Sequence, residues 1–150
     1  SNSDKYCVAY KTIYKPINES KYVGDPTNII CRSLWERKVC KYMDMNENIV
    51  RWGSEEIAIP YVSPLDNKVH RYYPDFIAEI KTKNGEVKTK IIEVKPYKQT
   101  LEPDRGKKRK ATYLKECATY SVNQAKWKAA KEVCEKKGWQ FTVLTEKELF

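Results

Sequence analysis

The dipeptide Asn84-Gly85 stands between two apolar runs, and no other feature of the sequence restricts the fold as strongly. The first run covers residues 69–80, and the second covers residues 87–94. Asn-Gly readily takes the positive φ angles of a type I′ turn. The pattern therefore predicts a β-hairpin in which the second run returns antiparallel to the first.

Three charged side chains lie on the strands of this hairpin. Asp75 belongs to the first strand, and Glu93 and Lys95 belong to the second. Side chains alternate along a strand, so residues 93 and 95 project from one face, and the turn brings Asp75 near them. Unpaired charges are costly beside Phe76-Ile77 and Ile91-Ile92, which indicates a function, although a solvated strand face is the alternative. Carboxylates favour Mg²⁺, and Lys95 then positions a water or neutralises developing charge.

Helical spacing flanks the hairpin on both sides. Apolar side chains fall on one face from Ser33 to the polar residues at Asn46, which predicts the first helix. The residues of that face are Leu34, Trp35, Val39, Tyr42 and Met43. Apolar residues recur again from Tyr113 to Val133, and Gly138 is typical of a C-cap, which predicts one long helix or two abutting helices.

Further strands complete an α/β pattern. They are expected at residues 49–52, 57–61 and 139–144, with Thr145 capping a short final helix. The predicted order of the core is helix, three strands, helix, strand, with helices flanking a central mixed sheet. Residues 1–30 are polar and contain several breakers, which indicates an N-terminal arm or loop that packs on a domain of residues 31–150.

The composition limits the function. The chain of 150 residues has the size of one domain, and its hydrophobic fraction of 41% is sufficient for a core. It carries 29 Lys and Arg against 20 Asp and Glu, a net charge of +9, which favours a nucleic-acid partner over a merely soluble basic surface. His70 is the only histidine, so multi-histidine zinc sites and nucleases of the HNH type are excluded.

The cysteines and the apolar runs indicate the compartment. The five cysteines form no C-x-x-C pair, so we expect reduced thiols rather than a disulfide framework or a zinc ribbon. No apolar stretch approaches the roughly 20 residues that span a bilayer, and no signal-peptide pattern opens the chain. We therefore expect a soluble, cytoplasmic protein without membrane contact.

Pro74-Asp75 followed by Glu93-Val94-Lys95, on a hairpin, resembles the motif of the PD-(D/E)xK nuclease superfamily. The predicted order of elements is similar to the core of that superfamily, which implies a restriction-endonuclease-like domain. Residues 32–36, 123–127 and 141–147 resemble TnsA-type endonucleases. Residues 22–26, 32–36 and 71–76 resemble the head completion nucleases of large contractile-tailed bacteriophages, and this resemblance covers almost the entire chain.

The resemblance implies a DNA endonuclease that hydrolyses phosphodiester bonds with Mg²⁺, for which Mn²⁺ can substitute. The implied catalytic residues are Glu36, Asp75, Glu93 and Lys95, and the implied metal ligands are Asp75, Glu93 and Val94. Ser33-x-x-Glu36 is also a capping box, so Glu36 has a purely structural alternative role. Glu56 is the reserve candidate for the third carboxylate.

A basic connection follows the hairpin, and it has six basic residues between positions 98 and 110. We expect it to line a groove and to contact phosphates without reading sequence, with a solvated loop as the alternative. Asn123 and Lys126, one turn apart on the long helix, either face the same groove or are plain surface residues. The complete DNA-binding set is Lys98, Lys107, Lys108, Arg109, Lys110, Asn123 and Lys126.

The resemblance also implies a biological role, which is the processing of DNA ends as phage heads are completed after packaging. The expected partners are double-stranded or branched DNA and phage head or portal proteins, in the infected bacterial host or the virion, and the oligomeric state stays open. A TnsA-like transposition subunit is one alternative. A non-catalytic DNA-binding head-assembly protein is another, but the presence of Asp75 and Lys95 argues against it.

Overall fold

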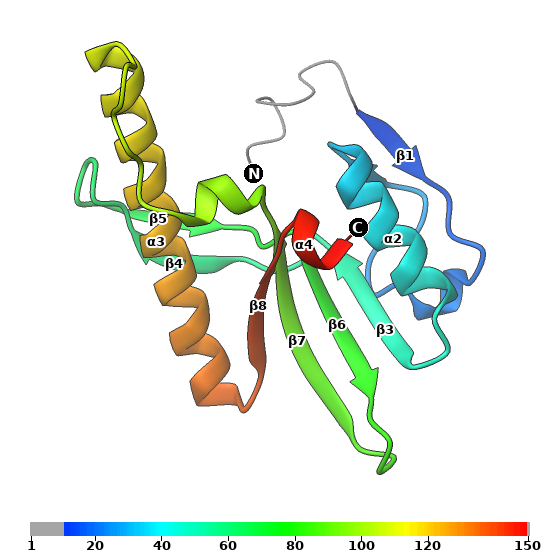
Figure 1. Ribbon diagram of the computed structural model, residues 1–150. Helices are drawn as coiled ribbons and strands as arrows, with labels where there is room; N and C mark the ends of the chain where they lie inside the picture. The colour runs from blue at the N-terminus through cyan, green and yellow to red at the C-terminus, as the bar shows by residue number, and fades with distance from the viewer. Residues whose placement is uncertain (1–10, 150) are drawn as a thin grey trace.

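A four-stranded sheet with the spatial order β3-β6-β7-β8 forms the centre of the computed structural model, which describes residues 11–149 (Figure 1). Its strands are β3 (Ile49–Ser54), β6 (Phe76–Lys81), β7 (Val87–Val94) and β8 (Gln140–Leu144). β6 pairs antiparallel with both β3 and β7, whereas β8 pairs parallel with β7, so the sheet is mixed as predicted. The parallel pair needs a crossover connection, and the helix α3 (Lys110–Lys137) supplies it.

Helices cover both faces of this sheet, as the sequence predicts. Along β7, Ile92 packs in a core with side chains of α2 (Leu34–Met45), and Ile91 packs in a second core with side chains of α3. This alternation follows from the two-residue period of a strand. β7 is apolar on both faces at this point because helices exclude water from each.

The turn between β6 and β7 is not the predicted type I′ turn. Gly85 has φ +84°, but Asn84 has no positive φ, which a type I′ turn requires. The Gly85 amide donates to the Thr82 carbonyl at 3.0 Å, and the Thr82 amide donates to the Glu86 carbonyl at 2.8 Å. These bonds define a three-residue loop with glycine in the left-handed position, and its odd length places Phe76 opposite Ile92.

The run at residues 69–80, predicted as one strand, is two strands. β5 (Val69–Tyr72) ends before Pro74, which has no amide hydrogen to donate to a ladder, and β6 begins at Phe76. β5 pairs with β4 (Ile59–Val62) in a separate hairpin that packs against α3. The central elements α2, β3, β6, β7, α3 and β8 have the predicted order of helix, three strands, helix, strand.

α2 has the predicted ends but a different buried face. Ser33 is its N-cap and Asn46 is its C-cap. Leu34 and Tyr42, both assigned to the apolar face, are 67% and 57% exposed. The buried residues are Glu36, Val39, Cys40, Met43 and Asp44. Val39 and Met43 are buried and Trp35 packs against the core, as predicted, but apolar periodicity could not mark Glu36 and Asp44, which are carboxylates held by hydrogen bonds.

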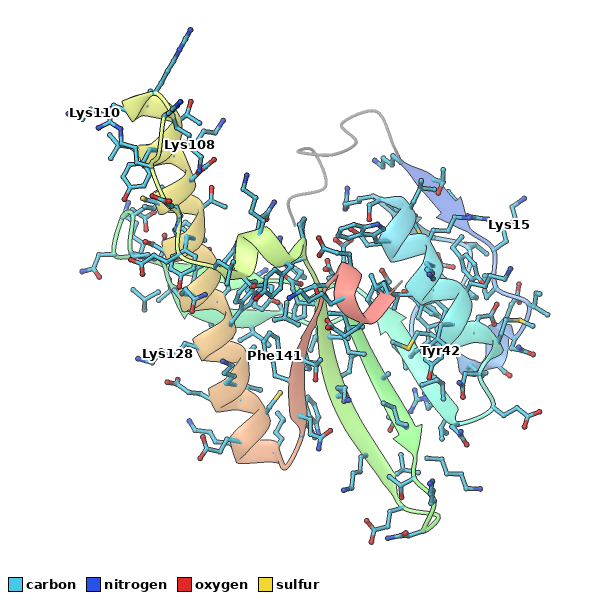
Figure 2. The ribbon with its side chains drawn as sticks, in the orientation of Figure 1. Lys15, Tyr42, Lys108, Lys110, Lys128 and Phe141 are labelled. Atoms are coloured by element: carbon cyan, nitrogen blue, oxygen red, sulfur yellow. The ribbon has the colours of Figure 1, made fainter. Side chains whose placement is uncertain are left out.

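α3 is one continuous helix, and Gly138 ends it with φ +70°, as expected for a C-cap glycine. Its buried residues are Asn123, Trp127, Ala130 and Cys134, so burial begins only at the middle of the helix. The first half extends beyond the sheet, and Lys108 and Lys110 lie at its free end (Figures 1 and 2). Two short helices complete the described chain: η2 (Tyr97–Thr100) after β7, and α4 (Glu146–Leu149), which Thr145 caps as predicted.

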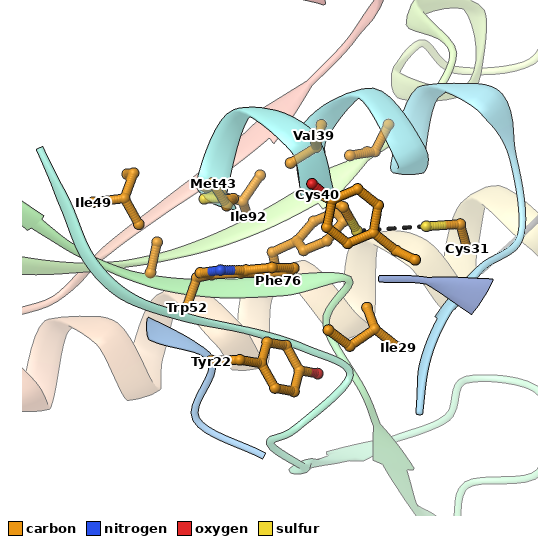
Figure 3. Close-up of a cluster of buried hydrophobic side chains, with 13 residues drawn as sticks. Tyr22, Ile29, Cys31, Val39, Cys40, Met43, Ile49, Trp52, Phe76 and Ile92 are labelled. Atoms are coloured by element: carbon orange, nitrogen blue, oxygen red, sulfur yellow. Dashed lines mark hydrogen bonds between the residues drawn. The ribbon is translucent and has the colours of Figure 1, made fainter. Parts of the chain in front are cut away.

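The segment predicted as an arm contributes strands and core side chains. β1 (Thr12–Tyr14) pairs antiparallel with β2 (Ile29–Cys31), and η1 (Glu19–Lys21) lies between them. Tyr14 meets the ring of Trp52 edge-on at a centroid distance of 6.2 Å. Tyr22 meets the same ring edge-on at 4.8 Å, in the core under α2 (Figure 3). Residues 1–10 of the expected arm lie outside the described part of the chain.

The cysteines of the described residues are free thiols. Cys31 and Cys40 belong to the core in Figure 3, with their Sγ atoms 3.5 Å apart, and Cys117 and Cys134 lie on α3. Cys7 falls outside the described residues. Among residues 11–149, no helix combines the length and apolarity needed to cross a membrane.

Asp44, near the end of α2, ties the N-terminal segment to this helix. Its carboxylate is fully buried and accepts hydrogen bonds from the Tyr14 hydroxyl (2.8 Å), the Ile17 amide (2.8 Å) and the Asn18 amide (2.9 Å). Burial alone raises the pKa of Asp44, but these bonds and the charge of Lys21 outweigh it and lower the pKa below its usual value. The ionised carboxylate therefore stabilises the fold.

Replacing Asp44 by Asn is expected to lower the free energy of unfolding by about 2 to 3 kcal/mol at neutral pH, because an amide group then faces a main-chain donor. A lowered pKa means that the stabilisation is present at neutral pH and is lost as the pH falls through the folded-state pKa. The difference in unfolding free energy between the wild-type protein and the variant should therefore shrink in acid. Urea unfolding at neutral pH and at acidic pH measures this difference. The exposed Glu47→Gln is the matched control, and an equal loss in both variants contradicts this role.

Candidate active site

Asp75 and Glu93 meet where β6 begins. The register that pairs Phe76 with Ile92 places Asp75 opposite Glu93 one position further along. The Asp75 amide donates to Glu93 Oε1 at 3.1 Å, and the Val94 amide donates to Asp75 Oδ2 at 2.8 Å. One oxygen of each carboxylate thus accepts a hydrogen bond from the main chain opposite it, and this bond fixes the side chain.

Lys95 follows β7 directly and completes the predicted group. Its amide donates to the Leu144 carbonyl at 2.9 Å, which continues the parallel pairing with β8. Its Nζ lies 4.0 Å from Glu93 Oε2, as expected for residues two apart on one face of a strand. Asp75, Glu93 and Lys95 are 3%, 1% and 1% exposed, so two carboxylates and one ammonium are buried together.

Glu36 is buried at the start of α2, and it forms only half of the predicted capping box. Ser33 Oγ accepts from the Glu36 amide at 3.1 Å, but the Glu36 carboxylate accepts from the Arg32 amide at 3.2 Å rather than from that of Ser33. Burial is the main cause of its raised pKa, and Glu55 adds to it. Its negative charge also acts on Asp75, so a cap contact and a place beside the acidic pair are compatible.

The electrostatics of Asp75 are the opposite of those of Asp44. Burial raises the pKa of Asp75 well above its usual value, and the charges of Glu93 and Glu36 raise it further. Lys95 and the hydrogen bond from the Val94 amide oppose this rise without cancelling it. The Asp75 carboxyl therefore keeps its proton to a higher pH than an ordinary carboxyl, and a positive charge at the site would favour its ionised form.

The acidic pair supplies the ligands that Mg²⁺ favours. Mg²⁺ is commonly held by one or two carboxylates and keeps several waters. Within residues 11–149, no group of three or more His, Cys, Asp and Glu side chains is arranged to hold a metal ion. Two carboxylates with one oxygen each fixed by the main chain fit an open site of this kind.

Several side chains around the site were not predicted from the sequence as functional residues. Burial raises the pKa of Tyr72, and Glu93 and Asp75 raise it further, so its hydroxyl stays protonated beside the acids. Arg32 pairs with Glu55 at 3.3 Å, and the Glu55 amide donates to the Asp75 carbonyl at 3.1 Å. Glu55 also has φ +54°, an uncommon value for a residue other than glycine. Arg32 and Tyr72 fall within the segments 32–36 and 71–76, but no local pattern indicates these contacts, because the partners are distant in sequence.

Glu56, the reserve candidate, lies elsewhere. Its carboxylate accepts from the Tyr22 hydroxyl at 2.6 Å, and its side chain occupies the space above Gly24 and Gly53. It lines a hollow between β3 and β6 with residues such as Arg51. The charge of Glu36, and not that of Glu56, is therefore the one that acts on Asp75.

The structure distributes the DNA-binding candidates over three places. Lys98, Lys108 and Asn123 line one cavity. Lys126 lies instead over the rings of Tyr61 and Tyr72, 5.9 and 5.7 Å from their centroids. The remaining candidates, Lys107, Arg109 and Lys110, are exposed at the free end of α3. Asn123 and Lys126 thus have different neighbours, although they are only about one helical turn apart on α3.

Residues 46–146 match the family of TnsA-like endonuclease N-terminal domains. This match covers more than half of the chain, so the chain belongs to the TnsA-like endonucleases, as the sequence predicts. It is also similar to the head completion nuclease of Enterobacteria phage T4, to which it is 40% identical over 146 residues, covering 93% of each chain. The family range contains Asp75, Glu93 and Lys95, and it begins after Glu36.

Replacing Asp75 by Asn is expected to stabilise the protein by about 0.5 to 2 kcal/mol in metal-free buffer. The amide oxygen can still accept from the Val94 amide, while the variant removes one charge from a buried acidic group. Urea unfolding with a chelator present measures the change. Asp44→Asn is the matched control with the opposite sign, and a destabilised Asp75→Asn contradicts the electrostatic description of the site.

Proposed function

We propose that this chain is a phage nuclease that acts in head completion, and that it hydrolyses phosphodiester bonds in DNA with a divalent metal ion. The observation that carries this proposal is that Asp75, Glu93 and Lys95 are buried close together. The membership of the chain in the TnsA-like endonucleases and its 40% sequence identity to a head completion nuclease support the proposal. Mg²⁺ is the proposed ion, and Mn²⁺ is the expected substitute.

Each residue of the site has a different proposed role. Asp75, Glu93 and the main chain of Val94 would hold the metal ion, which supplies Lewis-acid activation of the phosphodiester and of a water. The Lys95 ammonium orients that water or neutralises charge that develops on the phosphate. Glu36 completes the negative cluster from α2. A cation bound at Asp75 would oppose the effects of burial, Glu93 and Glu36 that raise the pKa of this carboxyl.

The proposed biological role is the processing of DNA ends after packaging, on double-stranded or branched DNA. Phage head or portal proteins are the proposed partners, and the infected host cell or the virion is the proposed location. The acidic group also supports a transposition endonuclease, but the identity across nearly the whole chain favours head completion. A non-catalytic DNA-binding protein does not explain the buried carboxylates, which are costly to retain without a function.

Asp75→Asn, Glu93→Gln and Lys95→Ala are each expected to abolish cleavage and to leave DNA binding largely intact, because chemistry and phosphate contacts lie on different residues. Purified protein is incubated with linear, circular and branched DNA, with and without Mg²⁺, and products are read on a gel. Glu86→Gln, in the exposed hairpin loop, is the matched control and should cleave normally. Wild-type cleavage by Asp75→Asn, or full activity in a chelator, refutes the site assignment.

For Glu36, two substitutions separate catalysis from capping. Glu36→Gln keeps an oxygen that accepts from the Arg32 amide but loses its charge, so turnover should fall far more than stability. Ser33→Ala removes the side-chain cap and should cost about 0.5 to 2 kcal/mol of stability with turnover retained. Turnover assays and thermal unfolding of both variants provide the comparison. Normal turnover by Glu36→Gln shows that the residue only caps its helix.

The basic connection is expected to contribute phosphate contacts through its free end. Lys108 donates to Glu116 at 2.7 Å, so its charge is already paired. Replacing Lys107, Arg109 and Lys110 together by Ala should reduce the slope of log affinity against log salt by about 2 to 3, since each phosphate contact contributes about 0.9. Lys108→Ala is the control and should change the slope little. An unchanged slope in the triple variant means that these residues do not contact DNA.

A further inference from the structure

A cavity of about 400 Å³ lies between α3 and the chain that follows β7. Its walls include Pro96 and Lys98 on one side and Tyr120 and Asn123 on the other. Pro96 is the residue after Lys95, so the cavity adjoins the acidic site. Its size is within the range of cavities that bind small planar ligands.

Asn123 indicates that this cavity takes a polar ligand. The residue is only 4% exposed, and its Nδ2 has no hydrogen-bond partner among residues 11–149. A buried donor without an acceptor is unfavourable, and because Nδ2 is itself buried, an acceptor brought by a ligand removes this cost only when the amide turns toward the cavity. The amide lies on the buried face of α3, one turn before Trp127.

The charges around the cavity argue against a phosphate as its occupant. Glu102, Asp104 and Glu116 line it, and they repel an anion. Of the two lysines in its wall, Lys108 is held by Glu116, which leaves Lys98 at the end nearer the acidic site. The positive potential that phosphate needs is therefore absent from the interior.

The same walls suit a nucleobase. Leu101, Pro103 and Tyr120 offer apolar and aromatic surfaces against which a base can stack. The Asn123 amide can donate to a ring nitrogen or carbonyl, and the carboxylates can accept from an exocyclic amino group. Lys98 is placed to contact the phosphate that joins this nucleotide to the strand.

We propose that this cavity binds one unpaired nucleobase of the DNA strand that is cut, so that the substrate class is DNA with unpaired nucleotides next to the scissile bond. This inference rests on the proposed nuclease function. A base reaches such a cavity only when it is unstacked, and the cost is smallest at a flap, gap or branch. A fully paired duplex therefore binds less tightly than a fork of the same length.

Binding to synthetic forks in a chelator tests the inference without cleavage. The first unpaired nucleotide of the fork is 2-aminopurine, a normal base or an abasic sugar. The wild-type protein should change the fluorescence of 2-aminopurine and should bind the abasic fork about tenfold more weakly than the normal one. Asn123→Ala and Tyr120→Ala should lose most of this preference. Gln124→Ala, on the exposed face of the same turn, is the matched control and should keep it.

Equal affinity of the wild-type protein for normal and abasic forks overturns the inference, as does an unchanged preference in Asn123→Ala. Thermal unfolding confirms that the variants are folded. Cleavage with Mg²⁺ is measured separately. A wild-type protein that cuts DNA but does not distinguish the two forks refutes only the base-binding cavity. A protein that distinguishes the forks but cuts no DNA refutes only the nuclease function.

Discussion

The register of β6 on β7 is the constraint on which the rest of the structure depends. It places Phe76 opposite Ile92 and, one position further, Asp75 opposite Glu93. Because side chains alternate along a strand, a slip of one residue turns a whole strand over. Such a slip would exchange the side chains that face α2 with those that face α3, and it would separate the two carboxylates. The left-handed φ of Gly85 allows the loop length that sets this register.

Buried carboxylates occur in two contrasting environments in this domain. Asp44 is surrounded by donors, so its ionised form joins α2 to the N-terminal segment. Asp75 is close to other acids, so its ionised form opposes folding until a cation compensates for the charge. The first arrangement is typical of a structural residue. The second concentrates unfavourable charge where the proposed chemistry needs it, and the surrounding cores hold it in place.

The acidic pair could be predicted from the sequence because its members lie on two strands joined by a short turn. Glu93 and Lys95 share a face by simple alternation, and Asp75 precedes the partner strand. The type of turn could not be read in the same way, since Asn-Gly fits a two-residue loop as well as the observed three-residue one. The pairing of Arg32 with Glu55 could not be predicted, because these residues meet only after β3 has packed beside the start of α2.

The sequence by itself determined the local features: the ends of α2 at Ser33 and Asn46, the end of α3 at Gly138, and the order of the central elements. Caps, turns and periodicity act between near neighbours, so they are legible without the fold. Only the tertiary structure decided which face of α2 is buried, that a hairpin separates β3 from β6, and that Asn123 lines a cavity beside the acidic site. These features depend on contacts between distant segments, whose free energy outweighs local preference.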